Sequence, residues 1–144
     1  MAKNSDFSLN FAEWLEIQQK IETPWHMPSI EDEKPELVRQ AKDMVVPYRR
    51  LLQAFLDGKL VKLSDKNWQK LENTDSNYPL LSWKQVKSWK KDWKSIKKAF
   101  EQGKSLPAPI VLLHNDKLIL VGGNTRLSIA KLMHKKPKIW LIKL

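Results

Sequence analysis

The chain has 144 residues, no cysteine and a formal net charge of +10 at pH 7. This length suffices for one domain with its own core, or for a small domain with an extension. The lack of cysteine excludes disulfides, thiolate metal sites and cysteine nucleophiles. No apolar run reaches the roughly 18–20 residues that cross a bilayer, and residues 1–10 lack the apolar centre of a signal peptide. We therefore expect a soluble cytoplasmic protein.

The first predicted element is a helix over residues 10–22. Asn10 and Glu13 have the spacing of a capping box, and apolar residues recur along one face of the segment. Pro24 and Pro28 follow, and two prolines so close together end a helix.

The acidic run Glu31-Asp32-Glu33 comes next, directly before Pro35. Negative charge is favourable at the beginning of a helix, so this position indicates helix-start chemistry. A metal site is the alternative interpretation, which we disfavour because no second acidic cluster completes it. Residues 35–57 are predicted to form one helix kinked at Pro47 or two short helices, with Gly58 as the C-terminal cap.

The segment from residue 60 to residue 80 is predicted to contain a short extended stretch, a short helix and the main internal boundary. Residues 60–63 are expected to extend briefly, and residues 64–73 to form a short helix capped by Ser64. The polar run over 73–77 and the proline at 79 are typical of a linker. We therefore divide the chain into a helical N-terminal extension, residues 1–80, and a second unit, residues 81–144.

A strongly amphipathic helix is predicted from Ser82 to Gly103. Apolar residues, tryptophans among them, recur at helical spacing, and Ser82 and Gln85 have the spacing of a capping box. The opposite face is rich in lysine, and a lysine face attracts phosphates as a set of point charges. The lysines that we select as candidates for nucleic-acid binding are Lys84, Lys87, Lys91, Lys94 and Lys98. A solvated face of a helix that packs through its tryptophans is the structural alternative.

The positive charge is concentrated in this second unit. Residues 1–81 contain 11 Lys/Arg and 13 Asp/Glu, whereas residues 82–144 contain 15 Lys/Arg and 3 Asp/Glu. Such asymmetry favours contact with a polyanion, nucleic acid before an anionic membrane surface or an acidic protein. A lysine surface that serves only solubility is the remaining alternative.

Beyond Gly103 the apolar period changes from that of a helix to that of strands. Residues 109–113 and 117–121 are predicted to pair as a hairpin through a tight turn at His114-Asn115-Asp116. A helix is expected over residues 124–134, and a last strand over residues 138–144.

Two glycines separate the second hairpin strand from the helix, in the order Gly122-Gly123-Asn124-Thr125-Arg126. Glycines let a backbone approach a ligand closely, and the first N–H groups of a helix are unpaired and carry partial positive charge. A threonine hydroxyl and an arginine fork add further donors for phosphate oxygens. We therefore predict that these five residues bind phosphate. The alternative is a plain tight turn in which Asn124 caps the helix and Arg126 lies on the surface.

The order of segments over residues 80–144 resembles the ParB/sulfiredoxin superfamily. The resemblance rests on the segments 107–112, 120–130 and 136–139 and on the helix start Gly123-x-x-Arg126-x-x-x-Ala130. Members share a helix, a Pro-Ile-Val strand, a hairpin, a glycine–arginine helix start and a closing strand. The resemblance implies that Gly122, Gly123, Asn124, Thr125 and Arg126 hold the phosphates of ATP or CTP, with or without Mg²⁺. Residues 1–80 resemble no family.

The sequence also departs from the branches of that superfamily. Sulfiredoxin-like members have a catalytic cysteine where Asn124 stands and a histidine where Thr125 stands, so sulfinic-acid reduction is excluded. ParB-like partition proteins have an acidic residue at position 123 and a further DNA-reading segment, so a chromosome-partition clamp is not expected. Phosphotransferases of the superfamily need an acidic general base, which the sequence does not place.

The acidic residues considered as that base do not form a motif. Asp116 lies in the hairpin turn and is expected only to make that turn. Glu13, Glu16 and Glu22 belong to the part of the chain without a resemblance. The catalytic residues are therefore unknown, and no metal site is predicted, because the three histidines show no metal-ligand spacing.

We therefore predict an α+β fold in which a helical N-terminal half packs on a small mixed sheet of ParB/sulfiredoxin type. The expected function is binding of nucleotide phosphates on or near DNA, as in compact phage or mobile-element proteins. Nucleotide hydrolysis or phosphate transfer is the reaction expected if the protein is an enzyme. One alternative is a non-enzymatic nucleic-acid-binding module, and another is a basic interaction protein that binds an acidic partner.

Overall fold

The computed structural model describes residues 24–62, 64, 66–67, 71–73, 83–88, 92–133 and 135–144. The predicted helix over residues 10–22 and the candidate lysine Lys91 lie outside these residues, as do Ser82 and most of the predicted linker. In chain order the elements are β1 (Trp25–His26), α2 (Ile30–Met44), α3 (Tyr48–Leu56), β2 (Lys59–Lys62), β3 (Glu72–Asn73), α5 (Trp83–Ser88), α6 (Trp93–Glu101), β4 (Leu106–Pro107), β5 (Ile110–His114), β6 (Lys117–Gly122), α7 (Asn124–Leu132) and β7 (Lys138–Lys143).

The centre of the molecule is a mixed sheet with the strand order β2-β7-β5-β6-β3. β5 pairs with β6 as an antiparallel hairpin and with β7 in parallel. The edge strands β2 and β3 pair with β7 and β6, respectively. A separate parallel pair joins β1 to β4. The combination confirms the predicted α+β class, and the sheet takes strands from both sides of residue 81.

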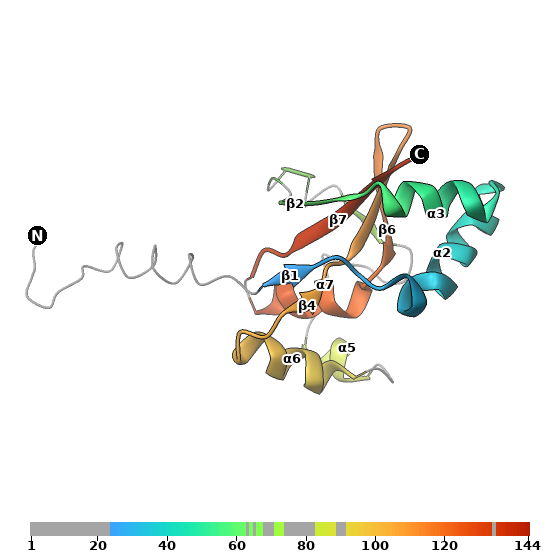
Figure 1. Ribbon diagram of the computed structural model, residues 1–144. Coiled ribbons are helices and arrows are strands. Elements are labelled where there is room, and N and C mark those ends of the chain that lie inside the picture. The colour runs from blue at the N-terminus through green and yellow to red at the C-terminus, as the bar shows by residue number, and fades with distance from the viewer. Residues whose placement is uncertain are drawn as a thin grey trace, which may run out of the picture.

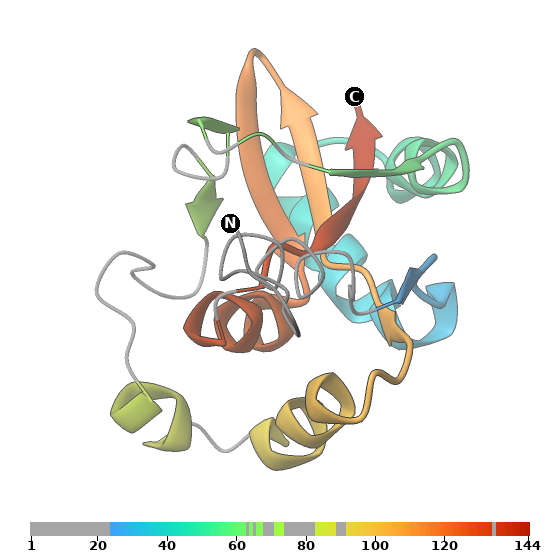
Figure 2. The same cartoon turned by 90° about the vertical axis from the view of Figure 1, so that its left-hand side faces the viewer.

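Helices cover both faces of the sheet. Alternate residues of a strand point to opposite faces, and Ile110 and Leu112 of β5 pack in one apolar cluster with α2 and α3. Val111 packs in a second cluster with Leu127 of α7. α7 lies between the sheet and the α5–α6 pair, which forms the outermost layer (Figures 1 and 2). None of the described helices is long and apolar enough to cross a membrane.

The hairpin and the final strand form as the sequence predicts. Asn115 and Asp116 have φ angles of 50° and 62°. Two consecutive positive φ values are typical of the turns whose twist matches that of hairpin strands, and Asn and Asp tolerate them better than most residues. The expected role of Asp116 as a turn residue is confirmed.

Residues 30–56 form two helices, the second of the two predicted alternatives. Val45 ends α2 in the left-handed conformation, and Pro47 is the extended N-cap residue before α3, where its missing N–H costs no helical bond. The predicted start at residue 35 is wrong, because α2 begins at Ile30 and contains Pro35. Glu33 N–H bonds to Ser29 O at 3.0 Å, so the acidic run forms the first turn, as its helix-start interpretation predicts.

Gly58 does not act as the predicted C-terminal cap, because the cap of α3 is Asp57 and Gly58 has no positive φ. Its role is to leave space. A Cβ at Gly58 would lie 2.4 Å from Nε1 of Trp140, which donates a hydrogen bond of 2.9 Å to Phe55 O. The glycine therefore allows β7 to dock its tryptophan against the end of α3.

Two further helix predictions are corrected. The single helix predicted from Ser82 to Gly103 is two helices, α5 and α6, because Asp92 begins a new helix by accepting a 3.2 Å hydrogen bond from Ser95 N. The predicted end at Gly103 is confirmed, with φ at 66°. Ser64 accepts a bond from Asn67 N as predicted, but the helix does not extend to residue 73, because β3 pairs there with β6.

Candidate functional site

The predicted phosphate turn lies where β6 meets α7. Ile110 pairs with Gly122 and Val111 with Leu120, so Val121 is an extra residue on β6. Such bulges re-aim the end of a strand and are frequent beside functional sites. The turn is therefore built at an irregular end of the central hairpin.

Gly123 is the N-cap of α7 and has a φ of 87°, in the left-handed region. Two separate constraints require glycine at this position. A side chain would strain the backbone, and its Cβ would lie 2.8 Å from the Cα of Pro109. The expectation that Asn124 caps the helix is wrong, because Asn124 is already the first residue of α7.

Arg126 is largely buried and is held by a carboxylate from the other half of the chain. Its Nη2 lies 2.8 Å from Glu33 Oε1, and the two side chains are 18% and 9% exposed. The surface location that the alternative interpretation gave Arg126 is therefore wrong. Among the described residues, Arg126 Nε is the one buried side-chain nitrogen or oxygen without a hydrogen-bond partner.

The two glycines make room for this ion pair. A Cβ at Gly122 would lie 2.9 Å from Glu33 Oε2, and a Cβ at Gly123 would lie 2.9 Å from Arg126 Nη2. The carboxylate thus lies against the end of β6 and contacts the arginine that follows it. Close approach to Gly122, expected from the sequence for a phosphate, is made in this structure by Glu33.

A cavity of about 310 Å³ opens beside the pair. This volume is at the lower end of the roughly 300–1,000 Å³ that small-molecule sites occupy. All five predicted phosphate-binding residues line it, together with residues of α2, α6 and the end of β6. The complete lining is Asp32, Glu33, Glu36, Ile96, Leu120, Val121, Gly122, Gly123, Asn124, Thr125 and Arg126.

Asn124 and Thr125 are both buried, each 8% exposed. The Ser128 hydroxyl donates to Asn124 O at 2.8 Å, a local bond that fixes the first turn of α7. The backbone N–H groups of this turn carry the partial positive charge of a helix start. The first turn of α7 therefore gives this part of the cavity lining an electrostatic preference for a small anion.

The part of the cavity lining that α2 contributes is acidic, since Asp32, Glu33 and Glu36 come from its first two turns. Glu36 is already paired with Arg39. Three carboxylates against one arginine give the lining a net negative charge, so a bare polyphosphate would be repelled by part of the wall. Among the described residues, no group of three or more His, Asp and Glu side chains is placed to hold a metal ion.

The sequence alone does not connect these carboxylates with the site. Glu13, Glu16 and Glu22, the candidates for a base in the sequence, lie outside the described residues. The signal for Glu33 was weak, because a run of acidic residues at a helix start has an ordinary structural explanation. Only the fold brings Glu33 to Arg126, 93 positions away in the sequence.

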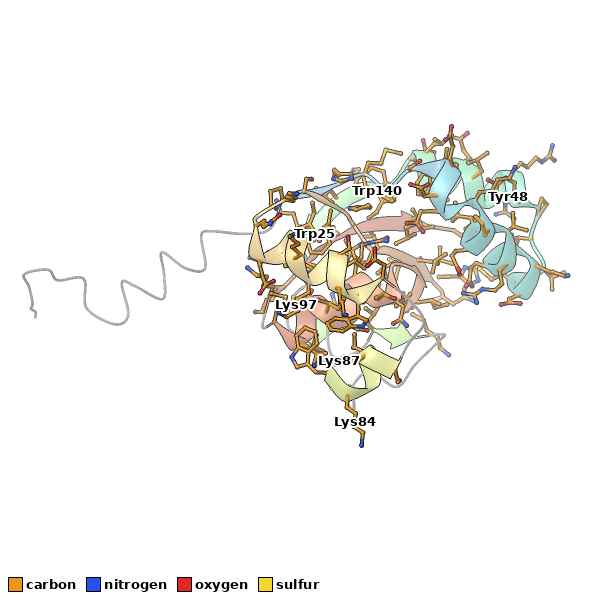
Figure 3. All side chains as sticks on the ribbon, turned by 90° about the horizontal axis from the view of Figure 1, so that it is seen from below. Trp25, Tyr48, Lys84, Lys87, Lys97 and Trp140 are labelled. Carbon is orange, nitrogen blue, oxygen red and sulfur yellow. The ribbon has the colours of Figure 1, made fainter. Side chains whose placement is uncertain are left out.

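The candidate lysines lie on the outer layer, away from the cavity lining. Lys84, Lys87, Lys94 and Lys98 are all exposed. Lys87 Nζ and Lys94 Nζ lie 5.6 Å and 5.7 Å from the centre of the Trp93 ring, and Lys97 Nζ lies 5.9 Å from that of Trp83. Figure 3 shows Lys84, Lys87 and Lys97 on the α5–α6 side of the molecule, with Lys84 directed away from the fold.

The two tryptophans under these lysines also join the helices, with ring centres 6.3 Å apart. Both rings pack partly against the core. The predicted combination of inward tryptophans and exposed lysines is therefore present on the described parts of α5 and α6. We call Lys84, Lys87, Lys94 and Lys98 the lysine face.

The described histidines have structural partners. His26 Nδ1 is 2.6 Å from Ser105 Oγ, which supports the β1–β4 pair, and His114 Nδ1 is 3.0 Å from Leu144 O.

Comparisons with protein families, with curated proteins and with solved structures give no significant match to this chain. The case for a function therefore rests on the geometry above.

Proposed function

We propose that the protein binds the phosphates of a nucleotide, ATP or CTP, in the cavity at Gly122–Arg126. The observation that carries the proposal is Arg126, whose buried Nε has no hydrogen-bond partner although the side chain lies at a cavity beside a helix start. Leaving a buried charged donor unsatisfied is costly, and a phosphate oxygen is a partner that a guanidinium binds especially well.

The order of elements supports the ParB/sulfiredoxin type as part of this proposal. α6 precedes β5, the hairpin β5–β6 leads into the Gly122-Gly123 turn, and α7 is followed by β7, which pairs with β5. This is the order that the resemblance implies for residues 80–144, and it places the glycine–arginine turn at the end of a central strand.

A reaction is open to this site, because the cavity supplies the acidic groups that the sequence alone could not place. For phosphate transfer or hydrolysis, an acceptor hydroxyl or water attacks the terminal phosphorus, its proton passes to a carboxylate, and the nucleoside diphosphate leaves. Asp32 is the candidate for that base, since Glu36 is paired with Arg39 and Glu33 with Arg126. Mg²⁺ would enter with the nucleotide and offset the acidic lining.

Action on or near DNA is the second part of the proposal. The lysine face carries exposed cations on α5 and α6, on the same layer that packs against α7. A non-enzymatic nucleic-acid-binding module is the competing function. The observation that favours it is the exposed lysine face, which could bind nucleic acid without any ligand in the cavity. It predicts binding that weakens steeply with salt and needs no nucleotide.

Isothermal titration with ATP, CTP and GTP, each with and without Mg²⁺, tests the nucleotide site. We expect one nucleotide to bind the wild-type protein, and Arg126→Ala to weaken that binding by about ten- to a hundredfold, the worth of a hydrogen bond to a charged group. Arg49→Ala is the matched control, because Arg49 is an exposed arginine of α3 outside the cavity. Failure of all three nucleotides to bind, or equal losses in both variants, would contradict the proposal.

A further inference from the structure

We propose that Glu33 is an internal occupant of the anion site, so that a phosphate binds by exchanging with its carboxylate on Arg126. This inference rests on the proposed function and deepens it, because it states what a ligand must displace. It makes Glu33 the residue that sets which anions the site accepts. A ligand must outcompete a carboxylate that is already built into the fold.

The position of the carboxylate is the first argument. Glu33 Oε1 accepts from Arg126 Nη2 at 2.8 Å, and Oε2 lies 2.9 Å from the place where a Cβ of Gly122 would be. A phosphate that approached the glycine backbone and formed a fork with Arg126 would need the same space. The carboxylate and the phosphate therefore cannot hold these positions together.

Burial and charge give the second argument. The Glu33 side chain is 9% exposed, and the remaining charged groups of the lining, apart from Arg126, are the carboxylates of Asp32 and Glu36. Adding a phosphate while Glu33 stays in place would bring like charges together around a single guanidinium, where the low local dielectric strengthens their repulsion. Moving Glu33 away from Arg126 removes the nearest of these charges.

The opposite role for Glu33 is that of a positioning residue, which would hold Arg126 in the orientation that a ligand needs. The two roles predict effects of opposite sign when the charge of Glu33 is removed. Glu33→Gln serves this purpose, because the amide has nearly the same shape and can still accept a hydrogen bond from Arg126, but it carries no charge.

The test is titration of the full chain with inorganic pyrophosphate, ATP and CTP. Exchange predicts that Glu33→Gln binds at least one of them about tenfold more tightly than the wild type or better, since a hydrogen bond to a charged group contributes about that factor. The matched control is Glu31→Gln, which removes the same charge from an exposed position in the same turn of α2. Its affinity should stay close to that of the wild type.

Equal or weaker binding by Glu33→Gln, measured against Glu31→Gln, would overturn the exchange while leaving the phosphate site in place. Absence of binding in the wild type and in both variants would instead remove the proposed function itself. If Glu33→Gln does not fold, hydrogen exchange of the wild-type protein decides. Saturating ligand should then make the amides of residues 31–36 exchange faster, because α2 loses its tie to α7, and slower exchange would refute the idea.

Discussion

Two parts of the protein offer cations to a phosphate, and they hold those cations in different ways. Arg126 is fixed in a largely buried position by Glu33, beside a cavity shaped by two glycines. The lysines of the lysine face are exposed, and the ammonium groups of Lys87 and Lys94 lie over the Trp93 ring. A fixed arginine selects a ligand by its shape, whereas exposed lysines attract any polyanion and are screened by salt.

The difference separates two features that the sequence presents together. The C-terminal part of the chain is strongly basic, yet the cavity that contains its predicted phosphate turn is lined by three carboxylates and one arginine. The acidic side chains come from α2, in the part of the sequence with a slight excess of negative charge. Global charge therefore indicates the lysine face and gives no information about the cavity.

The largest effect is expected from the glycine that shapes the cavity. Gly123→Ala forces an alanine into the left-handed backbone conformation, and its Cβ would lie only 2.8 Å from the Pro109 Cα. We expect a loss in the free energy of unfolding of about 2–5 kcal/mol, from backbone strain and overpacking together. Urea unfolding measures it.

The control for this substitution lies at the end of the lysine-bearing helix. Gly103 also has a positive φ, but a Cβ there would have no neighbour within 4 Å. Gly103→Ala should therefore cost only the backbone strain, about 1–2 kcal/mol. Equal losses for the two variants would show that the turn around Gly123 is looser than the packing against Pro109 requires.

A smaller and purely electrostatic effect is expected at the lysine face. Replacing Lys84, Lys87, Lys94 and Lys98 by Gln should make the slope of log affinity for duplex DNA against log salt shallower by as much as about 3–4, since each phosphate contact contributes about 0.9. Nucleotide binding in the cavity should change little, because none of these lysines lines it. Fluorescence anisotropy over a salt series measures the slope.

The control carries the same loss of charge in another place. Lys42, Lys59, Lys117 and Lys143 are exposed lysines of α2, β2, β6 and β7. Their replacement by Gln should leave most of the slope intact. If this variant loses as much of the slope as the first, the attraction comes from the net charge of the protein and not from the lysine face.

The sequence predicts those parts of the site that depend on neighbouring residues. The hairpin turn, the glycine start of α7 and the end of α6 at Gly103 each follow from local conformational preferences, and each is confirmed. Glu33 could not be predicted in the same way, because its partner Arg126 is 93 positions away and an acidic first turn is common without any function.

The errors in helix assignment have a related cause. Gly58 looked like a cap, but its role depends on Trp140, which the fold places beside it. The period of apolar residues from Trp83 to Phe100 continues across Asp92, so periodicity alone predicted one helix. The Asp92 side chain caps the start of α6 and so divides the segment into two helices. A cap contributes only about 1 kcal/mol, and the spacing of apolar residues carries no sign of it.

That side chain gives the smallest effect that we predict, and it tests whether the two regions are independent. α6 carries lysines of the lysine face and also lines the cavity through Ile96. Asp92→Ala removes the acceptor for Ser95 N and should lower the free energy of unfolding by about 1 kcal/mol. Asp92→Asn retains a side-chain acceptor and should lower it by only about 0.3 kcal/mol.

Thermal unfolding and nucleotide titration of both Asp92 variants measure these effects together. Because Ile96 is the one α6 residue in the cavity lining, we expect nucleotide affinity to change by less than about twofold, far below the tenfold that corresponds to 1.4 kcal/mol. A tenfold loss of affinity in Asp92→Ala would mean that the position of α6 controls the cavity. The lysine face and the phosphate site would then act as one unit, with DNA contact on α6 able to influence the nucleotide bound at α7.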